Sequence, residues 1–254
     1  MRWGPAAATA VLLLAGCGSG PDAGTDASGG LSGTVTVFAA ASLTGSFGTL
    51  GEQFEAVHPG VTVRFNFGAS SALAESIAQG APADVFAPAS AKNMESVVRA
   101  GDAAEPRTFA RNVLAIAVPP DNPAGVAGLA DLAEPGLKLA LCQEQVPCGM
   151  VARQVIDKAG LTLRPVTLGA DVKAVLTAVQ LGEVDAGLVY ATDVRAAGDK
   201  VEGIEIPAAQ NASTSYPIAV LTGAPNAAAA RAFVDHVLSA DGSTVLARAG
   251  FARP

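Results

Sequence analysis

Apolar, often β-branched runs alternate with segments of helical hydrophobic spacing along most of the chain. The first pair starts at residues 34–43, T-V-T-V-F-A-A-A-S-L, and continues with apolar residues at helical spacing through Leu50 and Phe54. This pattern predicts a buried strand, a tight turn of small residues and a helix whose first turn holds Ser42. The carboxyl end of such a strand and a helix N-terminus together suit an anion. The alternative interpretation is that Ser42 only caps its helix.

The same order of elements recurs downstream. Residues 61–67 alternate between apolar and polar side chains, and Gly68-Ala69-Ser70-Ser71 leads from them into a helix that ends at Gly80. Further strands are predicted at residues 82–87, 112–118, 137–141, 165–168, 186–190, 204–207 and 217–221, and further helices at 91–100, 149–159, 172–181, 226–238 and 241–249. The alternation predicts an α/β protein with a mostly parallel sheet flanked by helices. The chain contains more strand–helix units than one small sheet needs. We therefore expect two lobes with a ligand cleft between them, joined by crossovers at 112–118 and 217–221.

The N-terminus has the pattern of a secretory signal. A short positive start is followed by an apolar run at residues 6–15, which is too short to span a bilayer, and by small residues. Leu14-Ala15-Gly16-Cys17 resembles the lipobox of bacterial lipoproteins, in which the cysteine is acylated and becomes the first residue after cleavage. Residues 1–17 are therefore interpreted as a lipoprotein signal peptide, with an ordinary signal and a chance cysteine as the alternative. Lipidation of Cys17 would anchor the exported protein to the outer face of the cell membrane.

Composition narrows the classes of function. Residues 18–33 are rich in Gly, Ser, Asp and Thr and predict a flexible tether. Half of the residues are hydrophobic and 15% are charged, so a packed core is expected. The net charge is −7 without any basic cluster, which argues against nucleic-acid binding. An acidic protein that binds an anion must use local dipoles, since its overall field repels the ligand.

The cysteines and histidines indicate neither a metal site nor a catalytic one. Cys142 and Cys148 are close together in an exported chain, which indicates a disulfide between them. His58 precedes a proline and His236 lies in a predicted helix, so both are interpreted as structural or surface residues. The chain has no G-x-S-x-G, H-E-x-x-H, P-loop or G-x-G-x-x-G motif. We therefore expect no enzyme activity and no cofactor.

Five short motifs occur in the order and spacing of one family. They are F-A-A-A-S-L at 38–43, F-G-A-S-S-A-L-A at 67–74, G-A-P-A-D-V-F at 80–86, V-P-C-G at 146–149 and G-L-V-Y at 187–190. In these motifs the chain resembles the molybdate-binding proteins of ABC importers, which are substrate-binding proteins of the two-lobed, crossover type (type II periplasmic binding proteins). The similarity covers essentially all of residues 34–251. We expect residues 34–112 with 218–254 to form lobe 1, and residues 113–217 to form lobe 2.

The resemblance implies a site for a tetrahedral oxyanion made of two serines, two backbone N–H groups and a tyrosine hydroxyl. Matched motif by motif, the serines are Ser42 and Ser70, the backbone donors belong to Cys148 and Val172, and the hydroxyl is that of Tyr190. All of these groups donate hydrogen bonds, and all but the tyrosine lie at or next to predicted helix starts, where the helix dipole favours an anion. Taken singly, the serines as caps and the tyrosine as a core residue remain alternatives, but the ordered set favours a binding site.

Cys148 and Asp171 each raise a question about the predicted oxyanion site. The family usually has alanine where this chain has Cys148, and the contact is through the backbone, so a cysteine need not abolish it. A bond to Cys142 would stiffen this loop and lower the ordering cost of binding, whereas a bond that turned the amide away would remove the donor. A dianion with bare oxygens can accept from every donor, while hydrogen phosphate needs an acceptor, for which Asp171 is the adjacent candidate.

The resemblance therefore implies a monomeric lipoprotein that captures molybdate, and also tungstate, and delivers it to an ABC importer permease. Closure of the two lobes over the anion would signal that the ligand is bound. The alternative within this fold is sulfate or another tetrahedral oxyanion. Sulfate-binding relatives use a tryptophan indole as a donor, but Trp3 lies in the predicted signal and the mature chain has no tryptophan. A structural or adhesive lipoprotein without a small ligand is the remaining alternative.

Overall fold

The first predicted strand, turn and helix lie where the pattern places them. β1 (Gly33–Ala40) runs into a short 3-10 turn, η1 (Ala41–Leu43), and then into α1 (Thr44–Val57). The computed structural model describes residues 30–254. The predicted signal peptide, the predicted acylation site Cys17 and residues 18–29 of the predicted tether lie outside the described residues.

The strands form one hydrogen-bonded path in the order β2-β1-β3-β9-β4-β7-β5-β6, with β8 beside β4. The other strands are β2 (Val61–Gly68), β3 (Val85–Ala87), β4 (Arg107–Val118), β5 (Leu139–Cys142), β6 (Thr167–Gly169), β7 (Ala186–Tyr190), β8 (Glu202–Glu205) and β9 (Ser213–Val220). β1 pairs in parallel with β2 and β3, and β5 pairs in parallel with β6 and β7. The antiparallel pairs of these strands all involve β4 or β9. The predicted parallel sheet is therefore confirmed within each half, and the connecting strands add the antiparallel pairs.

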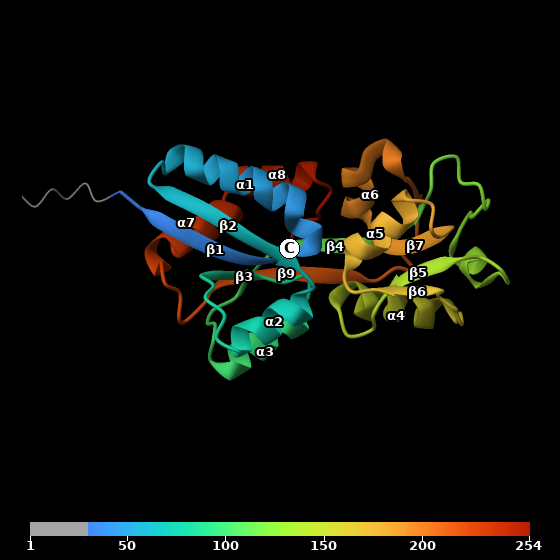
Figure 1. Ribbon diagram of the computed structural model, residues 1–254, viewed down its shortest axis with the longest axis horizontal. Coiled ribbons are helices and arrows are strands. Elements are labelled where there is room, and N and C mark those ends of the chain that lie inside the picture. The colour runs from blue at the N-terminus through green and yellow to red at the C-terminus, as the bar shows by residue number, and fades with distance from the viewer. Residues whose placement is uncertain (1–29) are drawn as a thin grey trace, which may run out of the picture.

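Helices cover both faces of the sheet in each half. In one half α1, α7 and α8 lie on one face, and α2 and α3 lie on the other; in the other half α5 and α6 lie opposite α4 (Figure 1). The bounds are α2 (Ser70–Ala78), α3 (Ala91–Ala100), α4 (Pro147–Ala159), α5 (Val172–Gln180), α6 (Ala191–Ala197), α7 (Ala227–Leu238) and α8 (Ala240–Arg248), and two further 3-10 turns are η2 (Leu129–Ala133) and η3 (Gly198–Lys200). Within the described residues, no helix combines the length and the apolar character that crossing a membrane requires.

The buried apolar side chains divide into separate cores. One core is drawn from residues 114–212, together with Ala41. The others combine residues from both ends of the described chain, from Val35 to Ala110 and from Tyr216 to Phe251. Apolar burial stabilises each core by roughly 25 cal/mol per Å². Each half therefore has a hydrophobic core of its own.

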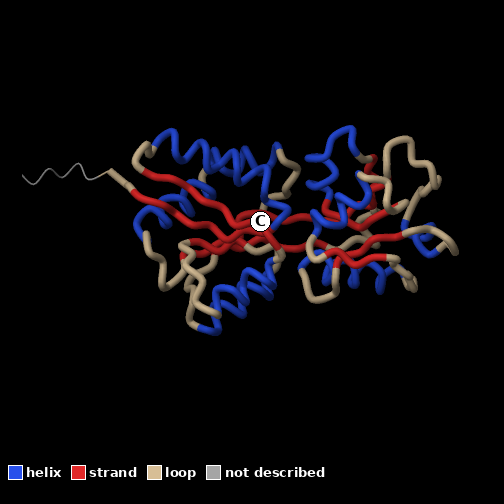
Figure 2. The backbone as a smooth tube through the Cα atoms, viewed as in Figure 1, coloured by secondary structure: helices blue, strands red, loops and turns tan. Residues whose placement is uncertain are grey.

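Two long strands join the halves, as Figure 2 shows in red at the centre of the molecule. β4 and β9 pair with each other from Arg107 opposite Ile218 to Val113 opposite Ser213. Beyond this shared ladder, β4 pairs with β7 and β9 pairs with β3. The crossovers predicted at 112–118 and 217–221 are thus confirmed as strands that connect the two halves.

Both connecting strands begin earlier than the sequence predicts. β9 starts before Pro217, a residue that normally argues against a strand interior because it cannot donate to the ladder. Pro217 lies opposite Thr108, and the register shifts between Thr108 and Ala110, so an irregularity in β4 accommodates the proline.

The helix α6 was not predicted at all. It follows Tyr190 directly, and no Ser, Thr, Asp or Asn stands at its N-cap to announce it.

Candidate functional site

Strand ends and helix starts from both halves converge on one small cavity of about 20 Å³. A cavity must offer about 10–15 Å³ to hold a single water, so this one suits only a compact group. All of the predicted donor residues line it: Ser42, Ser70, Cys148, Val172 and Tyr190. The structure therefore brings together residues that are up to 148 positions apart in the chain, from Ser42 to Tyr190.

Four of these residues lie at helix starts in the structure. Ser42 is in η1 immediately before α1, and Ser70 and Val172 are the first residues of α2 and α5. Cys148 is the second residue of α4, after Pro147. Within these described helices, α2 and α4 have no side-chain hydrogen bond to their N-terminal turns. Their N–H groups point their partial positive charge toward a ligand at this position.

Tyr190 ends β7 and is almost completely buried, with 1% of its surface exposed. Among the described residues, its hydroxyl has no hydrogen-bond partner. A buried polar atom without a partner is rare in folded proteins and calls for an explanation such as a ligand. Burial raises the pKa of Tyr190 well above its ordinary value, so the hydroxyl keeps its proton and is available as a donor.

The Ser70 hydroxyl is prepared for the same role. Its Oγ accepts a hydrogen bond from the backbone N–H of Ala89 at 3.0 Å. Because that bond uses an oxygen lone pair, the hydroxyl hydrogen remains available to the cavity. Ser70 is 1% exposed, so this arrangement is shielded from bulk water.

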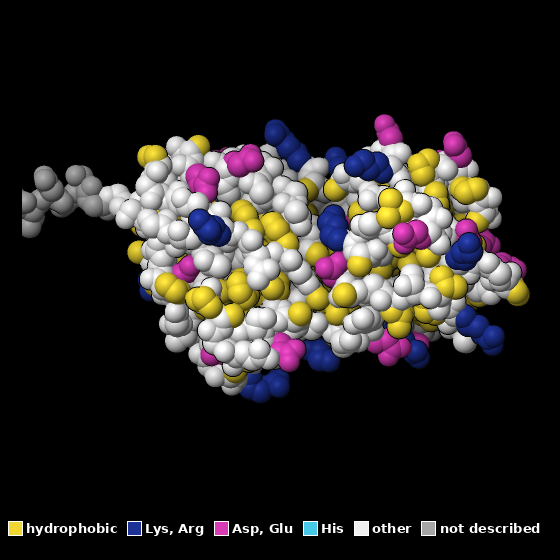
Figure 3. Space-filling view, viewed as in Figure 1, with side chains coloured by type: hydrophobic (Ala, Val, Ile, Leu, Met, Phe, Trp, Pro, Cys, Tyr) yellow, Lys and Arg dark blue, Asp and Glu magenta, His cyan; other side chains and the backbone are white. Residues whose placement is uncertain are grey.

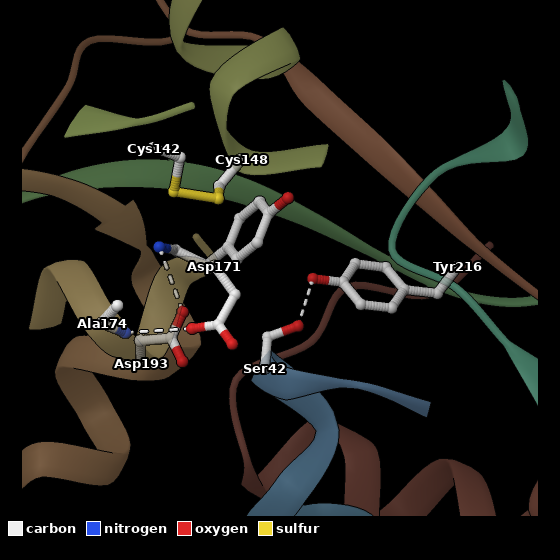
Figure 4. Close-up of a disulfide and its surroundings, with 8 residues drawn as sticks. Ser42, Cys142, Cys148, Asp171, Ala174, Asp193 and Tyr216 are labelled. Carbon is white, nitrogen blue, oxygen red and sulfur yellow. Dashed lines mark hydrogen bonds between the residues drawn. A yellow bond between two sulfur atoms is a disulfide. The ribbon is translucent and has the colours of Figure 1, made fainter. Parts of the chain in front are cut away.

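The Ser42 hydroxyl lies 2.9 Å from the hydroxyl of Tyr216, a residue that the sequence reasoning missed (Figure 4). Tyr216 is fully buried in β9 and does not line the cavity. The alternation of side chains along a strand could have identified Tyr216. Residues two positions apart point to the same face, and both Tyr216 and Ile218 are fully buried. The prediction began this strand at Pro217 and so left Tyr216 outside it.

A disulfide joins Cys142 at the end of β5 to Cys148 in the first turn of α4, with Sγ atoms 2.02 Å apart (Figure 4). The loop that it closes is held further by backbone bonds. The N–H of Gln143 donates to the carbonyl of Gly169 at 3.0 Å, and the N–H of Val146 donates to the carbonyl of Gln143 at 3.2 Å. Cys148 therefore remains at the cavity wall in a tightly connected loop.

A buried carboxylate supports the turn that holds Tyr190. Asp193 is completely buried, and its Oδ2 accepts the backbone N–H of Tyr190 at 3.3 Å. Its other oxygen lies 2.8 Å from Nζ of Lys173, in the first turn of α5. Burial raises the pKa of Asp193, and the charge of Lys173 works against that rise. This ion pair ties the start of α6 to α5, and the sequence reasoning missed it.

Among the described residues that line the cavity, Asp171 is the only acidic one. Its Oδ1 accepts the N–H of Ala174 at 3.0 Å, which makes it the N-cap of α5 (Figure 4). Elsewhere, His58 and His236 both pack against the ring of Phe54. In the part of the chain that the structure describes, no cluster of three His, Cys, Asp or Glu side chains is placed to hold a metal ion.

A wider groove of about 420 Å³ shares Ser42 with the cavity and lies between α1 and α8 of one half and α5 and α6 of the other. Its lining holds the cations Lys173, Arg195 and Arg248 and, among residues 30–254, no acidic side chain. Figure 3 shows Lys and Arg side chains on both sides of the junction between the halves. Lys173 is paired with Asp193, so Arg195 and Arg248 supply the positive charge that offsets the net charge of −7 locally and favours the approach of an anion from this side.

The model of the bacterial extracellular solute-binding protein family matches residues 35–252. The chain belongs to this family. The molybdate-binding protein ModA of Mycobacterium tuberculosis is 42% identical over the full length of both chains. The putative ABC transporter substrate-binding lipoprotein YvgL of Bacillus subtilis is 32% identical over 97% of this chain and 95% of its own. Among solved structures, the periplasmic molybdate-binding protein of Azotobacter vinelandii shares the fold, with a TM-score of 0.78 at 22% identity over 87% of this chain and 99% of its own.

Membership of this family confirms the predicted architecture of the type II periplasmic binding proteins. It also agrees with the expectation that the chain is not an enzyme, because the family is one of solute-binding proteins. The residues that contact a ligand remain a prediction, for which the cavity provides the geometry.

We expect Tyr190→Phe to weaken oxyanion binding by about 10- to 100-fold, since a hydrogen bond to a charged group contributes roughly 1.5–3 kcal/mol. The substitution removes a hydroxyl that has no partner among the described residues, so the unliganded protein should not lose stability. Isothermal titration calorimetry measures the affinity, and thermal unfolding without ligand is the control. Unchanged affinity would remove Tyr190 from the site.

Proposed function

We propose that this protein captures molybdate outside the cell membrane and delivers it to the permease of an ABC importer. The observation that carries the proposal is the buried Tyr190 hydroxyl, which has no hydrogen-bond partner in the described part of the chain and lies at a cavity surrounded by helix starts. The 42% identical relative from Mycobacterium tuberculosis, which carries the name of a molybdate-binding protein, supports the choice of ligand.

The proposed ligand contacts are three hydroxyls and two backbone N–H groups. Ser42, Ser70 and Tyr190 would donate through their hydroxyls, and Cys148 and Val172 through their backbone. A tetrahedral dianion can accept from all of them without a lysine or arginine in contact with it. Binding by neutral donors and helix termini also suits a ligand that must later be released to a transporter.

We assign residues 34–112 with 218–254 to lobe 1 and residues 113–217 to lobe 2. The cavity takes residues from both lobes, so a bound anion would hold them together. β4 and β9 are the only strands in the described sheet that pass between the two sets of parallel strands, which makes them the natural hinge. The liganded, closed form would then be the one that the permease recognises.

Tungstate should bind as molybdate does, because it is also a tetrahedral dianion with bare oxygens. Sulfate in the same fold is the alternative substrate. It is disfavoured here because the mature chain has no tryptophan to act as an indole donor. We propose that the protein acts as a monomer without a cofactor.

The proposed location is the outer face of the cell membrane, through a lipid on Cys17 and a tether at residues 18–33. The support is the lipobox-like sequence at residues 14–17 and the similarity to a relative named as a putative lipoprotein. Since a single acyl chain binds membranes only marginally, stable anchoring would require the multiple chains of a bacterial lipoprotein.

Thermal unfolding of the purified mature chain with molybdate, tungstate, sulfate or phosphate tests the function. A ligand at a hundred times its dissociation constant stabilises the folded state by about 2.7 kcal/mol. For a protein of this size that corresponds to a rise in Tm of about 5–10 °C. We expect the rise with molybdate and tungstate. A rise with sulfate instead would change the substrate, and no rise with any oxyanion would reject the transport function.

A further inference from the structure

The Ser42 hydroxyl is connected to two buried residues behind the cavity, Tyr216 and Asn112. Its Oγ lies 2.9 Å from the Tyr216 hydroxyl, and the Tyr216 hydroxyl lies 3.4 Å from Nδ2 of Asn112. Asn112 is 3% exposed, and Tyr216 is fully buried. Neither residue lines the cavity. The Tyr216 hydroxyl reaches the cavity through Ser42, while the Tyr216 ring packs against the ring of Tyr190, with ring centroids 6.1 Å apart.

The orientation of the Asn112 side-chain amide follows from its surroundings. Its Oδ1 accepts the backbone N–H of Val113 at 3.0 Å, while its Nδ2 donates to Oγ1 of Thr192 at 2.8 Å and to the Tyr216 hydroxyl. The reverse orientation would place an NH₂ group against the backbone N–H, two donors facing each other. The Tyr216 oxygen therefore faces a donor and must accept.

The buried hydrogen of the Tyr216 hydroxyl needs an acceptor of its own. By distance alone either hydroxyl of the Tyr216–Ser42 pair could donate, and Oγ of Ser42 at 2.9 Å is the nearest acceptor for the Tyr216 hydrogen, so we infer that Tyr216 donates to Ser42. Ser42 in turn accepts from Tyr216 and keeps its hydrogen for the cavity. The bonds run in one direction, from Asn112 through Tyr216 to Ser42 and on to the ligand position.

We propose that Tyr216, supported by Asn112, is a positioning residue that holds the Ser42 hydroxyl as a hydrogen-bond donor toward the ligand position. This inference rests on the proposed oxyanion function. While Tyr216 donates to the Ser42 oxygen, the Ser42 hydroxyl hydrogen does not point to Tyr216 and is available to the ligand. Ser70 is held in the same sense by the N–H of Ala89, so both serines face the ligand as donors.

A double-mutant cycle separates this role from a merely structural one. Molybdate affinity is measured by isothermal titration calorimetry for the wild type, Ser42→Ala, Tyr216→Phe and the double variant. We expect Tyr216→Phe to weaken binding about five- to tenfold in the wild-type background and by less than twofold in the Ser42→Ala background, because its effect passes through Ser42. Equal losses in the two backgrounds would overturn the proposal.

A matched control is available on the same strand. Thr214 is another buried hydroxyl of β9, and it donates to the carbonyl of Ala89 rather than to Ser42. We expect Thr214→Val to have the same effect on affinity with and without Ser42→Ala. Thermal unfolding of each ligand-free variant shows that it is folded, and Tyr216→Phe keeps the ring, so its packing is retained.

A wild type that binds no oxyanion would reject the proposed function itself, whereas a wild type that binds molybdate with an additive cycle would reject only the role of Tyr216.

Discussion

Gly149→Ala is expected to lower the free energy of unfolding by about 3 kcal/mol and to abolish tight oxyanion binding. Gly149 lies in the first turn of α4, next to Cys148. A Cβ atom at this position would overlap the carbonyl oxygen of Gln143 and would lie 2.7 Å from its carbonyl carbon. These are backbone atoms of the loop closed by the disulfide, and Gln143 is also bonded to Gly169. The clash can be relieved only by moving the start of α4 away from the loop, which displaces the N–H groups at the cavity.

Gly48→Ala is the matched control for this substitution. Gly48 lies inside α1, and a Cβ there would meet no atom within 4 Å. Alanine is favoured over glycine in a helix by about 1 kcal/mol, so this variant should be slightly more stable than the wild type. Thermal unfolding compares the two, with an expected fall in Tm of about 6–12 °C for Gly149→Ala. Equal stability of the two variants would show that the loop and α4 are not packed as described.

Lys173→Met is expected to destabilise the protein by about 2–3 kcal/mol at pH 8, because it leaves Asp193 buried without its counter-ion. The size of the loss should depend on pH. Burial raises the pKa of Asp193 and Lys173 opposes that rise, so the variant's Asp193 should have a higher pKa than the wild type's. Asp171, which also faces Asp193, raises the pKa further in both proteins.

The direction of this pH dependence follows from whether the folded or the unfolded state binds the proton of Asp193 more tightly. A carboxyl with a raised pKa in the folded state favours folding while it is protonated and loses that advantage as the pH rises through the folded pKa. The difference in stability between the wild type and Lys173→Met should therefore be largest at pH 8 and shrink toward pH 5. Urea unfolding at both pH values measures it, and adding Asp193→Asn to Lys173→Met should recover part of the loss. A difference that is the same at both pH values would contradict this account.

The parts of the site that follow strands and small-residue turns could be predicted from the sequence. Ser42 and Ser70 each follow a β-branched or alternating run and precede helical spacing, and the structure places both at helix starts. These are local signals, carried by a few neighbouring residues. The order of the two connecting strands was also visible, because each contains a strongly apolar run.

The groups behind the cavity could not be predicted in the same way. The Tyr216 hydroxyl meets Ser42 across 174 positions of chain, and neither neighbourhood carries a motif for that contact. Asp193 looks like an ordinary surface carboxylate in the sequence A-T-D-V-R, yet it is completely buried beside Lys173. Such pairings depend on how distant elements pack, and a single sequence does not contain that information in local form.

The separate cores have a consequence for the order in which the chain can fold. The core of residues 114–212 is nearly continuous in sequence, and in the described chain only Ala41 and the partly buried Ala69 join it from outside. The core around Phe47 and Phe54 is completed by residues as late as Phe251, which pair distant segments at a high entropic cost of loop closure. During synthesis, the middle of the chain can therefore collapse first, while the N-terminal segment keeps its aromatic side chains exposed until the last residues arrive. A chain that stopped before α7 would contain a folded core at residues 114–212. The core around Phe47 and Phe54 would stay incomplete and prone to aggregation.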